Sequence, residues 1–221
     1  MTKQLILAGA SGLIGRKVVS LLAGFGFGFE VHVLTRRILD GMPSGTTQHV
    51  ADTAEWADRI AGLKPDVAIS CLGTTWSKSG KSEAAFRAVD LELVLAFAAA
   101  AQKAGARHVI SVSSVGASAK SAGFYLRTKG EVEDGLKQRG FERLDILRPS
   151  LLIGERGGER RLGERVGIML SPLTDALLHG SLRRYRSIDS QAVALAIANL
   201  AANGGQGTFI HENDAITALG G

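Results

Sequence analysis

The sequence predicts an α/β fold in which helices cover both faces of a doubly wound parallel sheet. Two observations predict it. Short apolar runs alternate along most of the chain with longer segments in which apolar residues recur at helical spacing, a pattern typical of βαβ units. In addition, a glycine-rich turn joins the first apolar run to the first helical segment, and such turns mark ligand sites at the strand ends of parallel sheets.

The composition fits one globular domain. The chain has 221 residues, of which 45% are hydrophobic and 21% charged, with 28 glycines and a single cysteine. A chain of this length buries roughly 70% of the surface that it exposes when unfolded, so its core needs neither disulfides nor a structural metal. Disordered, collagen-like and disulfide-stabilised proteins are excluded. The 26 Lys and Arg against 21 Asp and Glu give a formal net charge of +5, which favours anionic ligands.

The first elements follow from the apolar spacing. We expect a strand at residues 5–8 and a helix from residue 13, where apolar residues begin to recur at helical spacing. The next strand is expected at residues 31–34, after a segment at 24–29 whose alternating glycines favour a loop with buried aromatic rings. A weak third strand is expected at residues 48–50.

The later elements continue the alternation. Strands are expected at residues 66–72, 108–112, 144–147 and 208–210, and helices at residues 86–104 and 124–138. The alanine-rich helix at 86–104 is expected to lie buried against the sheet, because small side chains permit a close approach. Pro149 marks the end of the strand at 144–147.

The glycine-rich turn reads Gly9-Ala10-Ser11-Gly12-Leu13-Ile14-Gly15. Its glycines suit a tight turn, a close approach of the backbone to a pyrophosphate and close helix packing, with the anion at the helix N-terminus. The motif alone is weakly specific, and the alternative is an ordinary strand-to-helix turn. Its place between a strand and a helix favours a dinucleotide-binding, Rossmann-like fold.

The end of the second strand indicates which dinucleotide is bound. The sequence there is Thr35-Arg36-Arg37. An acidic residue at this point would bond the ribose 2′-hydroxyl of NAD, whereas two guanidinium groups attract a 2′-phosphate through charge-assisted hydrogen bonds. We therefore expect NADP(H) as the cofactor. The alternative is a solvated pair of surface arginines.

Candidate catalytic residues follow the strand at 108–112. Ser113 and Ser114 end this strand, and Tyr125 and Lys129 come next, four residues apart. Residues at i and i+4 share a helix face, so the Lys129 ammonium can help the Tyr125 phenol to give up its proton. Such a phenol can protonate a carbonyl oxygen as hydride arrives, and a serine hydroxyl can hold the same oxygen. The alternative is a tyrosine beside a lysine on a helix surface, which is common by chance.

Several segments together resemble a known family. They are the glycine-rich turn, Cys71-Leu72-Gly73-Thr74-Thr75, Phe86-Arg87-Ala88-Val89-Asp90, Ser113-Ser114, Tyr125-Leu126-Arg127-Thr128-Lys129-Gly130-Glu131-Val132-Glu133 and Leu147-Arg148-Pro149. They are similar to the atypical short-chain dehydrogenases of the HIV Tat-interacting-protein type. The resemblance extends from the first strand to about residue 153.

The resemblance implies a role for each matching residue. In the glycine turn, Ser11, Gly12, Leu13 and Ile14 would contact the pyrophosphate, and Gly9 and Gly15 would belong to the same cofactor-binding turn. Arg36 and Arg37 would bind the 2′-phosphate, Leu72 and Gly73 the adenosine-side ribose, and Asp52 the adenine amino group. Tyr125 and Lys129 would form the active-site pair, with Lys129 also bonding the nicotinamide ribose. Ser114 matches the catalytic serine better than Ser113, although a slip of one residue would exchange them.

The chain departs from the superfamily after the strand at 66–72. Where full-length enzymes have an Asn-Ala-Gly-type segment, it has Leu72-Gly73-Thr74-Thr75, which puts the proton-relay part of the mechanism in doubt. Two further segments leave alternatives open. Residues 155–165 are either a substrate loop with arginines for an acidic substrate or a solvated loop. Arg183, Arg184 and Arg186 flank Tyr185, a pattern that is weak evidence for nucleic-acid binding.

The sequence therefore predicts a cytoplasmic NADP(H)-dependent oxidoreductase that reduces a carbonyl on a small molecule. Residues 1–150 would form the cofactor-binding core of a single domain, and residues 151–221 a substrate loop and C-terminal helices. We expect no metal, nucleic-acid or membrane partner, and a homodimer is compatible with base rates. The alternatives are an NADP-binding sensor or regulatory interaction protein with little or no turnover, and a flavin or quinone reductase.

Overall fold

Seven parallel strands form the central sheet of the computed structural model, which describes residues 2–24, 26–153 and 178–221. The strands are β1 (Lys3–Ala8), β2 (Phe29–Thr35), β3 (Thr46–Val50), β4 (Val67–Ser70), β5 (His108–Val112), β6 (Arg143–Leu147) and β9 (Gly207–His211). Their order is β3-β2-β1-β4-β5-β6-β9, and every neighbouring pair is parallel. The chain thus winds outward from β1 in both directions, which confirms the predicted doubly wound parallel sheet.

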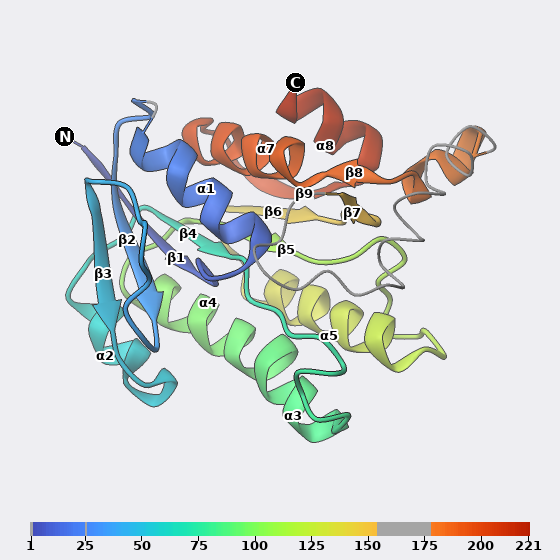
Figure 1. Ribbon diagram of the computed structural model, residues 1–221, viewed down its shortest axis with the longest axis horizontal. Coiled ribbons are helices and arrows are strands. Elements are labelled where there is room, and N and C mark those ends of the chain that lie inside the picture. Colours follow the sequence, from blue (N-terminus) through green and yellow to red (C-terminus); the bar gives the residue numbers. More distant parts are fainter. Residues whose placement is uncertain (1, 25, 154–177) are drawn as a thin grey trace.

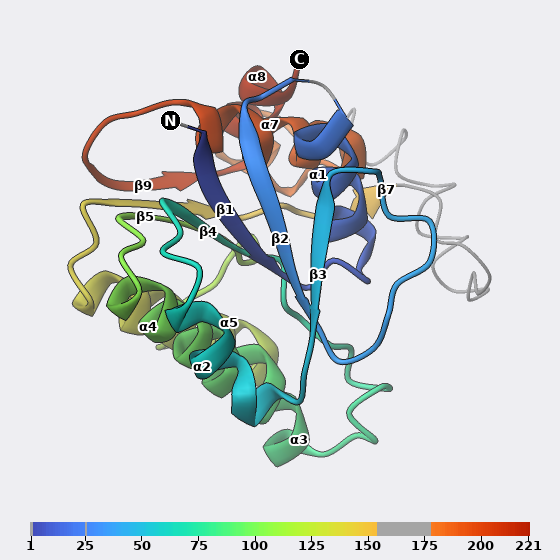
Figure 2. The same ribbon diagram turned by 90° about the vertical axis from the view of Figure 1, so that its left-hand side faces the viewer.

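Helices cover both faces of this sheet, as Figures 1 and 2 show. One face carries α1 (Leu13–Gly24), α7 (Ser190–Ala202) and α8 (Asn213–Gly220). The other carries α2 (Trp56–Ala61), α3 (Glu83–Arg87), a π-helical segment η2 (Ala88–Leu93), α4 (Val94–Lys103) and α5 (Phe124–Gln138). All helices in the described ranges fall short of the length and apolar character that a membrane span requires.

Two apolar clusters hold the sheet between these helix layers. Successive side chains of a strand point to opposite faces, and β1 shows the consequence. Leu5 and Leu7 pack with side chains of α1 and α7, whereas Ile6 and Ala8 pack with side chains of α4 and α5. All four are fully buried, as expected for the central strand of a sheet that is covered on both faces.

The strands predicted from the sequence are all present, with small changes at their ends. β2 begins at Phe29, inside the segment predicted as a loop, while Gly26 and Gly28 keep positive φ angles of 70° and 74°. Phe27 and Phe29 pack against the core, as expected, and Phe25 lies outside the described residues. The predicted helix at 86–104 is interrupted by the π-helical turn of η2.

Short elements complete the described part. They are η1 (Thr53–Glu55), η3 (Gly180–Tyr185) and a two-stranded sheet of β7 (Leu152–Ile153) and β8 (Ile188–Asp189). The sequence analysis did not predict α2, β7 or β8. Each has six residues or fewer, which is too short for apolar periodicity to distinguish it from a loop.

A buried carboxylate joins β5, β6 and β9. Asp145 accepts a hydrogen bond from Arg143 Nε at 2.6 Å, and its two oxygens lie 2.7 Å from His108 Nε2 and from His211 Nε2. Burial raises the pKa of the Asp145 carboxyl, but the hydrogen bonds from His108, His211 and Arg143 outweigh it and hold this pKa well below its ordinary range. Within the described ranges, no group of three or more His, Cys, Asp or Glu side chains is placed to hold a metal ion.

Candidate active site

The strand register brings the predicted site residues to one edge of the sheet. Ala8 of β1 pairs with Leu34 of β2 and with Ser70 of β4, and Ser70 pairs with Ser111 of β5. The segments that follow these strands are therefore neighbours in the order Thr35-Arg36-Arg37, the glycine turn, Leu72-Gly73 and Ser113-Ser114. The turn lies between β1 and β4 at the switch point of strand order, where open α/β sheets bind their ligands.

Packing explains two of the three glycines in the turn. Gly9 has a φ of 94°, and a Cβ on it would lie 2.4 Å from the backbone of Cys71. A Cβ on Gly15 would lie 2.3 Å from the carbonyl oxygen of Gly9. Gly12 differs, because it is exposed beside Ser11 at the start of α1. A Cβ added to Gly12 would lie 3.3 Å from the carbonyl oxygen of Gly9. An outside group can therefore approach the backbone closely at Gly12.

The first turn of α1 offers backbone donors rather than side chains. Ile14 is buried in the core and Leu13 is half-buried, so their side chains serve packing. The first N–H groups of a helix have no intrahelical acceptor, and with the helix dipole they attract an anion. Leu13, Ile14 and Gly15 can thus contact a pyrophosphate through their main chain.

Arginines surround the loop that follows β2. Arg36 and Arg37 are exposed, and neither guanidinium has an ion-pair or hydrogen-bond partner in the described part of the chain. The Thr35 hydroxyl fixes the turn by donating to the Arg37 carbonyl oxygen at 2.7 Å. Arg16 of α1 donates to the Asp40 carbonyl oxygen at 3.0 Å, which ties this loop to the helix that begins at the glycine turn.

Three further predicted residues lie along the same edge. Asp52 follows β3 and is exposed, and its side chain makes no capping hydrogen bond. Leu72 is half-buried and Gly73 is exposed. A Cβ on Gly73 would lie 3.5 Å from Asp90 Oδ1 and 3.9 Å from Lys129 Nζ, so the backbone at Gly73 borders the candidate catalytic lysine.

Tyr125 and the two serines occupy different environments. Tyr125 is in the first turn of α5, 44% exposed, with its ring edge-on to Phe86 at a centroid distance of 5.9 Å. Ser113 is buried and its hydroxyl donates to Glu133 Oε1 at 2.6 Å. Ser114 is half-buried, and its hydroxyl makes a long contact of 3.5 Å with the Val115 carbonyl oxygen. The Ser114 hydroxyl is therefore the one open to a ligand.

Lys129 has a partner that the sequence analysis did not select. Its Nζ lies 2.8 Å from Asp90 Oδ1, and both side chains are buried, 7% and 1% exposed. The other oxygen of Asp90 accepts the Thr74 N–H at 2.7 Å. Asp90 stands in the π-helical segment η2 and in one of the segments that carry the family resemblance. Nothing in the spacing of Asp90 and Lys129 indicates that they meet, because the fold alone brings η2 against α5.

Glu133 is a second buried residue that sequence reasoning missed. It accepts two hydrogen bonds from Arg148, at 2.9 Å from Nε and 2.6 Å from Nη2, in addition to that from Ser113. The bonds to Glu133 raise the pKa of the Arg148 guanidinium although burial opposes this. Arg148 Nη1 also lies 3.7 Å from Glu212. An ionic network thus joins the end of β5 to the segment after β9.

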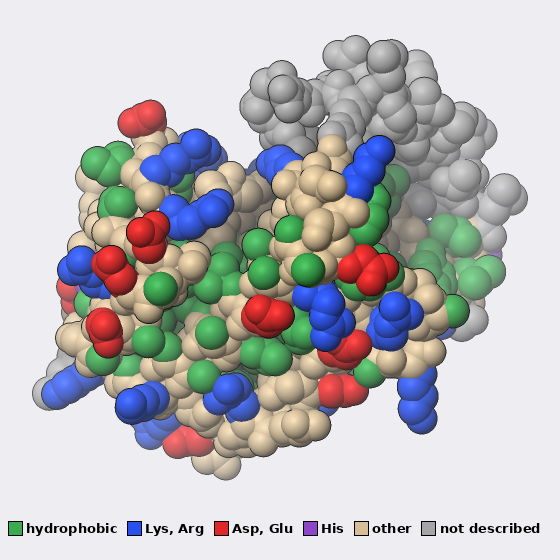
Figure 3. All heavy atoms as spheres, turned by 90° about the horizontal axis from the view of Figure 1, so that it is seen from below, with side chains coloured by type: hydrophobic (Ala, Val, Ile, Leu, Met, Phe, Trp, Pro, Cys, Tyr) green, Lys and Arg blue, Asp and Glu red, His purple; other side chains and the backbone are tan. Residues whose placement is uncertain are grey.

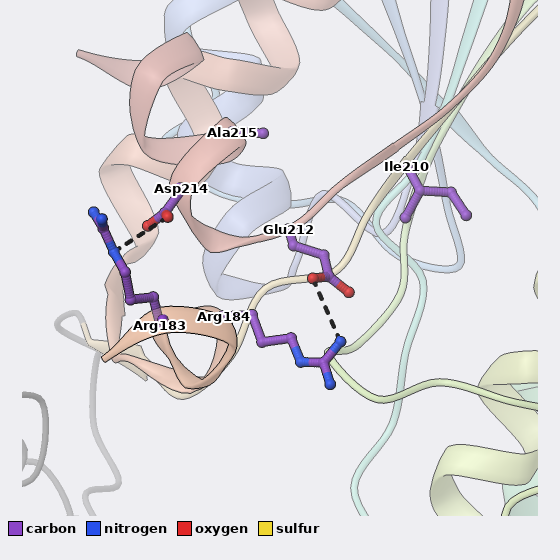
Figure 4. A pocket seen from close by; sticks show the side chains of 7 residues that line it. Arg183, Arg184, Ile210, Glu212, Asp214 and Ala215 are labelled. Atoms are coloured by element: carbon purple, nitrogen blue, oxygen red, sulfur yellow. Dashed lines mark ion pairs between the residues drawn. The ribbon is translucent and has the colours of Figure 1, made fainter. Parts of the chain in front are cut away.

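A hollow of about 510 Å³ lies next to this network. Figure 4 shows Arg183 and Arg184 of η3 pairing with Asp214 and Glu212, at 3.3 and 3.9 Å, beside Ile210 of β9. Arg186 does not line this hollow. Its Nε donates a hydrogen bond to the Leu178 carbonyl oxygen instead. The arginines that could have suggested nucleic-acid binding are thus paired with carboxylates or carbonyls. The predicted substrate loop at 155–165 lies outside the described residues.

Among the described residues, the face of α2, α4 and α5 carries charges of both signs. Figure 3 shows the face of α2, α4 and α5, on which Lys and Arg alternate with Asp and Glu among apolar side chains. An example is the ion pair between Arg87 and Glu131, at 2.7 Å.

Comparison with known proteins identifies the family. The HIM1 family model matches residues 58–180, more than half of the chain. Protein FMP52, mitochondrial, of Candida albicans is 33% identical over 204 residues, which cover 90% of this chain and 89% of the relative. The chain belongs to the HIM1 family. Protein fmp52, mitochondrial, of Emericella nidulans is 34% identical over 200 residues, or 87% of this chain and 84% of the relative.

The names of these HIM1-family relatives correct one prediction. They are called mitochondrial proteins, so the prediction of a cytoplasmic protein is wrong. A single cysteine is typical of a reducing compartment, but it does not distinguish one reducing compartment from another.

Solved structures show the fold of this HIM1-family chain. The Bordetella bronchiseptica enzyme WbmH in complex with NAD+ has a TM-score of 0.69 at 15% identity, covering 96% of this chain and 75% of that one. The dTDP-4-dehydrorhamnose reductase of Bacillus anthracis in complex with NADP has a TM-score of 0.67 at 16% identity, with the same coverage. The fold is therefore the α/β Rossmann-like fold that these NAD- and NADP-bound enzymes have. The narrower resemblance to the Tat-interacting type is not supported, because the matching family is HIM1.

Proposed function

We propose that this HIM1-family protein is an NADP(H)-dependent oxidoreductase that reduces a carbonyl group on a small molecule. The observation that carries the proposal is one juxtaposition. The exposed phenol of Tyr125 and the buried ammonium of Lys129 lie on one helix, at the same sheet edge as a glycine turn that is open at Gly12. The solved structures that share the fold hold NAD+ or NADP, which supports a nicotinamide dinucleotide here.

The residues at this edge fit such a dinucleotide. Gly12 leaves the backbone of the first turn of α1 accessible to a pyrophosphate. Arg36 and Arg37 supply two guanidinium groups without partners in the described residues, which suits a 2′-phosphate. The exposed Asp52 carboxylate at the end of β3 can accept the adenine amino group. Gly73, beside Lys129, leaves room for a ribose.

The chemistry assigned to the protein is proton transfer and orientation. The bound dinucleotide would supply a hydride to the carbonyl carbon. Tyr125 would donate its phenolic proton to the carbonyl oxygen, and the Ser114 hydroxyl would hold that oxygen during the transfer. Lys129 would bond the ribose hydroxyls and stabilise the phenolate that remains.

The substrate would enter from the side of η3. The hollow beside β9 has the volume of a small-molecule site. Its lining of Arg183, Arg184, Glu212 and Asp214 offers both signs of charge, so a polar carbonyl compound fits better than an apolar one. Glu212 is linked to Ser113 through Arg148 and Glu133, which would hold the hollow in a fixed position relative to the proton donor.

The experiment that tests the cofactor is a calorimetric titration with NADPH and NADH. We compare the wild type with the Arg36→Ala/Arg37→Ala variant. Loss of charge-assisted bonds to a 2′-phosphate should weaken NADPH binding by at least about tenfold, while NADH binding hardly changes. A matched control is Arg107→Ala/Arg139→Ala, which removes the same charge from exposed residues near the opposite ends of β5 and α5. It should bind both dinucleotides like the wild type.

Two results would refute the cofactor proposal. One is the absence of binding of either dinucleotide at millimolar concentration, which would make the glycine turn a structural feature only. The other is unchanged NADPH affinity in the Arg36→Ala/Arg37→Ala variant. If NADPH binds, a carbonyl-substrate screen follows, with Tyr125→Phe as the control. Turnover that persists in Tyr125→Phe would favour a flavin or quinone reductase instead.

A further inference from the structure

We propose that Gln48 is a positioning residue that fixes the main chain beside Arg36 and Arg37, so that their guanidinium groups are held in place for the 2′-phosphate of NADPH. The inference rests on the proposed function, because it adds a residue to the site proposed there for the 2′-phosphate. Gln48 lies on β3, outside the predicted catalytic and cofactor-binding sets, and it acts on the cofactor through the two arginines.

The Gln48 side chain bonds both main-chain groups of Leu39. Its Oε1 accepts the Leu39 N–H at 2.9 Å, and its Nε2 donates to the Leu39 carbonyl oxygen at 3.0 Å. A carboxamide can make both bonds because it carries an acceptor and a donor side by side. The pair of bonds repeats the exchange that two facing strand residues make. Leu39 comes two residues after Arg37, so these bonds fix the main chain where the arginine turn ends.

Burial makes the two bonds necessary. The Leu39 side chain is 6% exposed and belongs to the apolar cluster that β1, α1 and α7 share. The N–H and C=O groups of a residue drawn toward a core lose contact with water and need partners inside the protein. Gln48 supplies a partner for each. Replacing Gln48 with an apolar residue therefore favours movement of the Leu39 main chain toward water.

Two further bonds hold the turn on either side of Leu39. The Thr35 hydroxyl donates to the Arg37 carbonyl oxygen at 2.7 Å, and Arg16 Nη1 donates to the Asp40 carbonyl oxygen at 3.0 Å. The second bond ties the connection between β2 and β3 to α1, toward which this connection turns in Figure 2. The bonds to Leu39 are the middle tie, so without them the segment between the other two is free to change shape.

A fixed main chain favours binding of the 2′-phosphate. Arg36 and Arg37 are exposed, and a guanidinium binds phosphate oxygens through a directional fork of N–H groups. When the main chain is already fixed, binding orders only the two side chains. When it is free, binding must order the main chain as well, and this entropy cost lowers the affinity. NADH has no 2′-phosphate, so its affinity does not depend on the position of these arginines.

Calorimetric titration of Gln48→Ala with NADPH and with NADH tests the proposal. NADPH binding should weaken about tenfold, the effect of one residue's main chain that binding has to order. NADH binding should change by less than about twofold. The matched control is Gln102→Ala, which removes a glutamine of α4 whose Nε2 likewise donates to a main-chain oxygen, that of Arg139, at 3.0 Å. It should bind both dinucleotides like the wild type.

A second titration tests whether Gln48 acts through the arginines. In the Arg36→Ala/Arg37→Ala background, Gln48→Ala should change NADPH affinity by less than about twofold, because the groups that it positions are absent. A tenfold loss that persists in this background would overturn the proposal, since Gln48 would then act on another part of the cofactor.

Limited proteolysis tests the main chain without any cofactor. Trypsin cleaves after arginine, and the exposed Arg36 and Arg37 offer two such sites. Gln48→Ala should be cut there at least about five times faster than the wild type, because cleavage follows the population of the opened turn. Gln102→Ala should be cut there at the wild-type rate. Equal rates in Gln48→Ala and the wild type would contradict the proposed positioning.

The outcomes separate this inference from the proposed function. A wild type that does not bind NADPH refutes the proposed cofactor, and the inference with it. If the wild type binds NADPH while Gln48→Ala binds it equally well, or loses NADPH and NADH affinity to the same extent, only the inference is overturned.

Circular dichroism reports whether each variant folds. If Gln48→Ala does not fold, Gln48→Met removes both bonds at nearly the same side-chain length, with the same expected results. If neither folds while Gln102→Ala does, the bonds to Leu39 serve folding and the proposal is overturned.

Discussion

Ser113 and Ser114 are adjacent, yet the fold gives their hydroxyls opposite surroundings. Ser113 donates to the buried Glu133 carboxylate, whereas Ser114 has a long contact with a neighbouring carbonyl. Ser114→Ala should therefore lower kcat for carbonyl reduction at nearly unchanged stability. Ser113→Ala should reduce the free energy of unfolding by about 1.5 to 3 kcal/mol, the usual contribution of a hydrogen bond to a charged group. Steady-state kinetics and urea unfolding of both variants test this, and an exchange of the two effects would show that Ser113 is the residue that faces the substrate.

At the residue scale, the sequence analysis predicted the groups whose position in the fold depends only on residues next to them in the chain. The glycines of the turn, Arg36 and Arg37 follow strand ends directly, so a strand prediction places them at one edge of the sheet. Asp90 and Glu133 escaped prediction because their partners, Lys129 and Arg148, are distant along the chain. The sequence favoured Ser114 without excluding Ser113 for a related reason, since the hydroxyl that is occupied is decided by Glu133, which lies far along the chain.

At the scale of elements, different glycines of the turn before α1 serve packing and ligand binding. A Cβ on Gly15 would overlap the Gly9 carbonyl oxygen at 2.3 Å, whereas a Cβ on Gly12 would meet it at 3.3 Å. We expect Gly15→Ala to lower the free energy of unfolding by at least about 2 kcal/mol, since backbone must move in a close-packed core. Gly12→Ala should lower the free energy of unfolding much less than Gly15→Ala and should lose dinucleotide affinity. Thermal unfolding and calorimetry of both variants check this, and a stable Gly15→Ala would contradict it.

The elements themselves were predicted where the apolar pattern is long enough. The strand at 108–112 matches β5 residue for residue, and the helix at 124–138 matches α5. The π-helical turn of η2 was not predicted, because the apolar spacing over a single π-helical turn is close to that of an α-helix. The assignment of residues 151–221 as a substrate-binding part stays a prediction.

At the scale of the whole molecule, Asp145 makes the stability of the contact between β5, β6 and β9 depend on pH. Its folded-state pKa is held low, so the stability that it contributes is fully present above its unfolded pKa of about 3.9 and is lost as pH falls toward the folded value. Asp145→Asn should cost about 3 kcal/mol at neutral pH, as is usual when a buried ion pair loses one partner. The difference from the wild type should shrink below about pH 4. Chemical denaturation over a pH series measures this, and a difference that is constant with pH would contradict it.

The position of β1 at the centre of the sheet also has a consequence for synthesis on the ribosome. β1 pairs with β2 and with β4, and β4 ends at Ser70. Until that residue has emerged, the apolar β1 has an open edge, which is the kind of surface that pairs with other chains. The Gly9 turn also lacks its support until Cys71 follows. The nascent chain must therefore protect its first strand while some sixty residues are added, and chaperone demand should be greatest before β4 is complete.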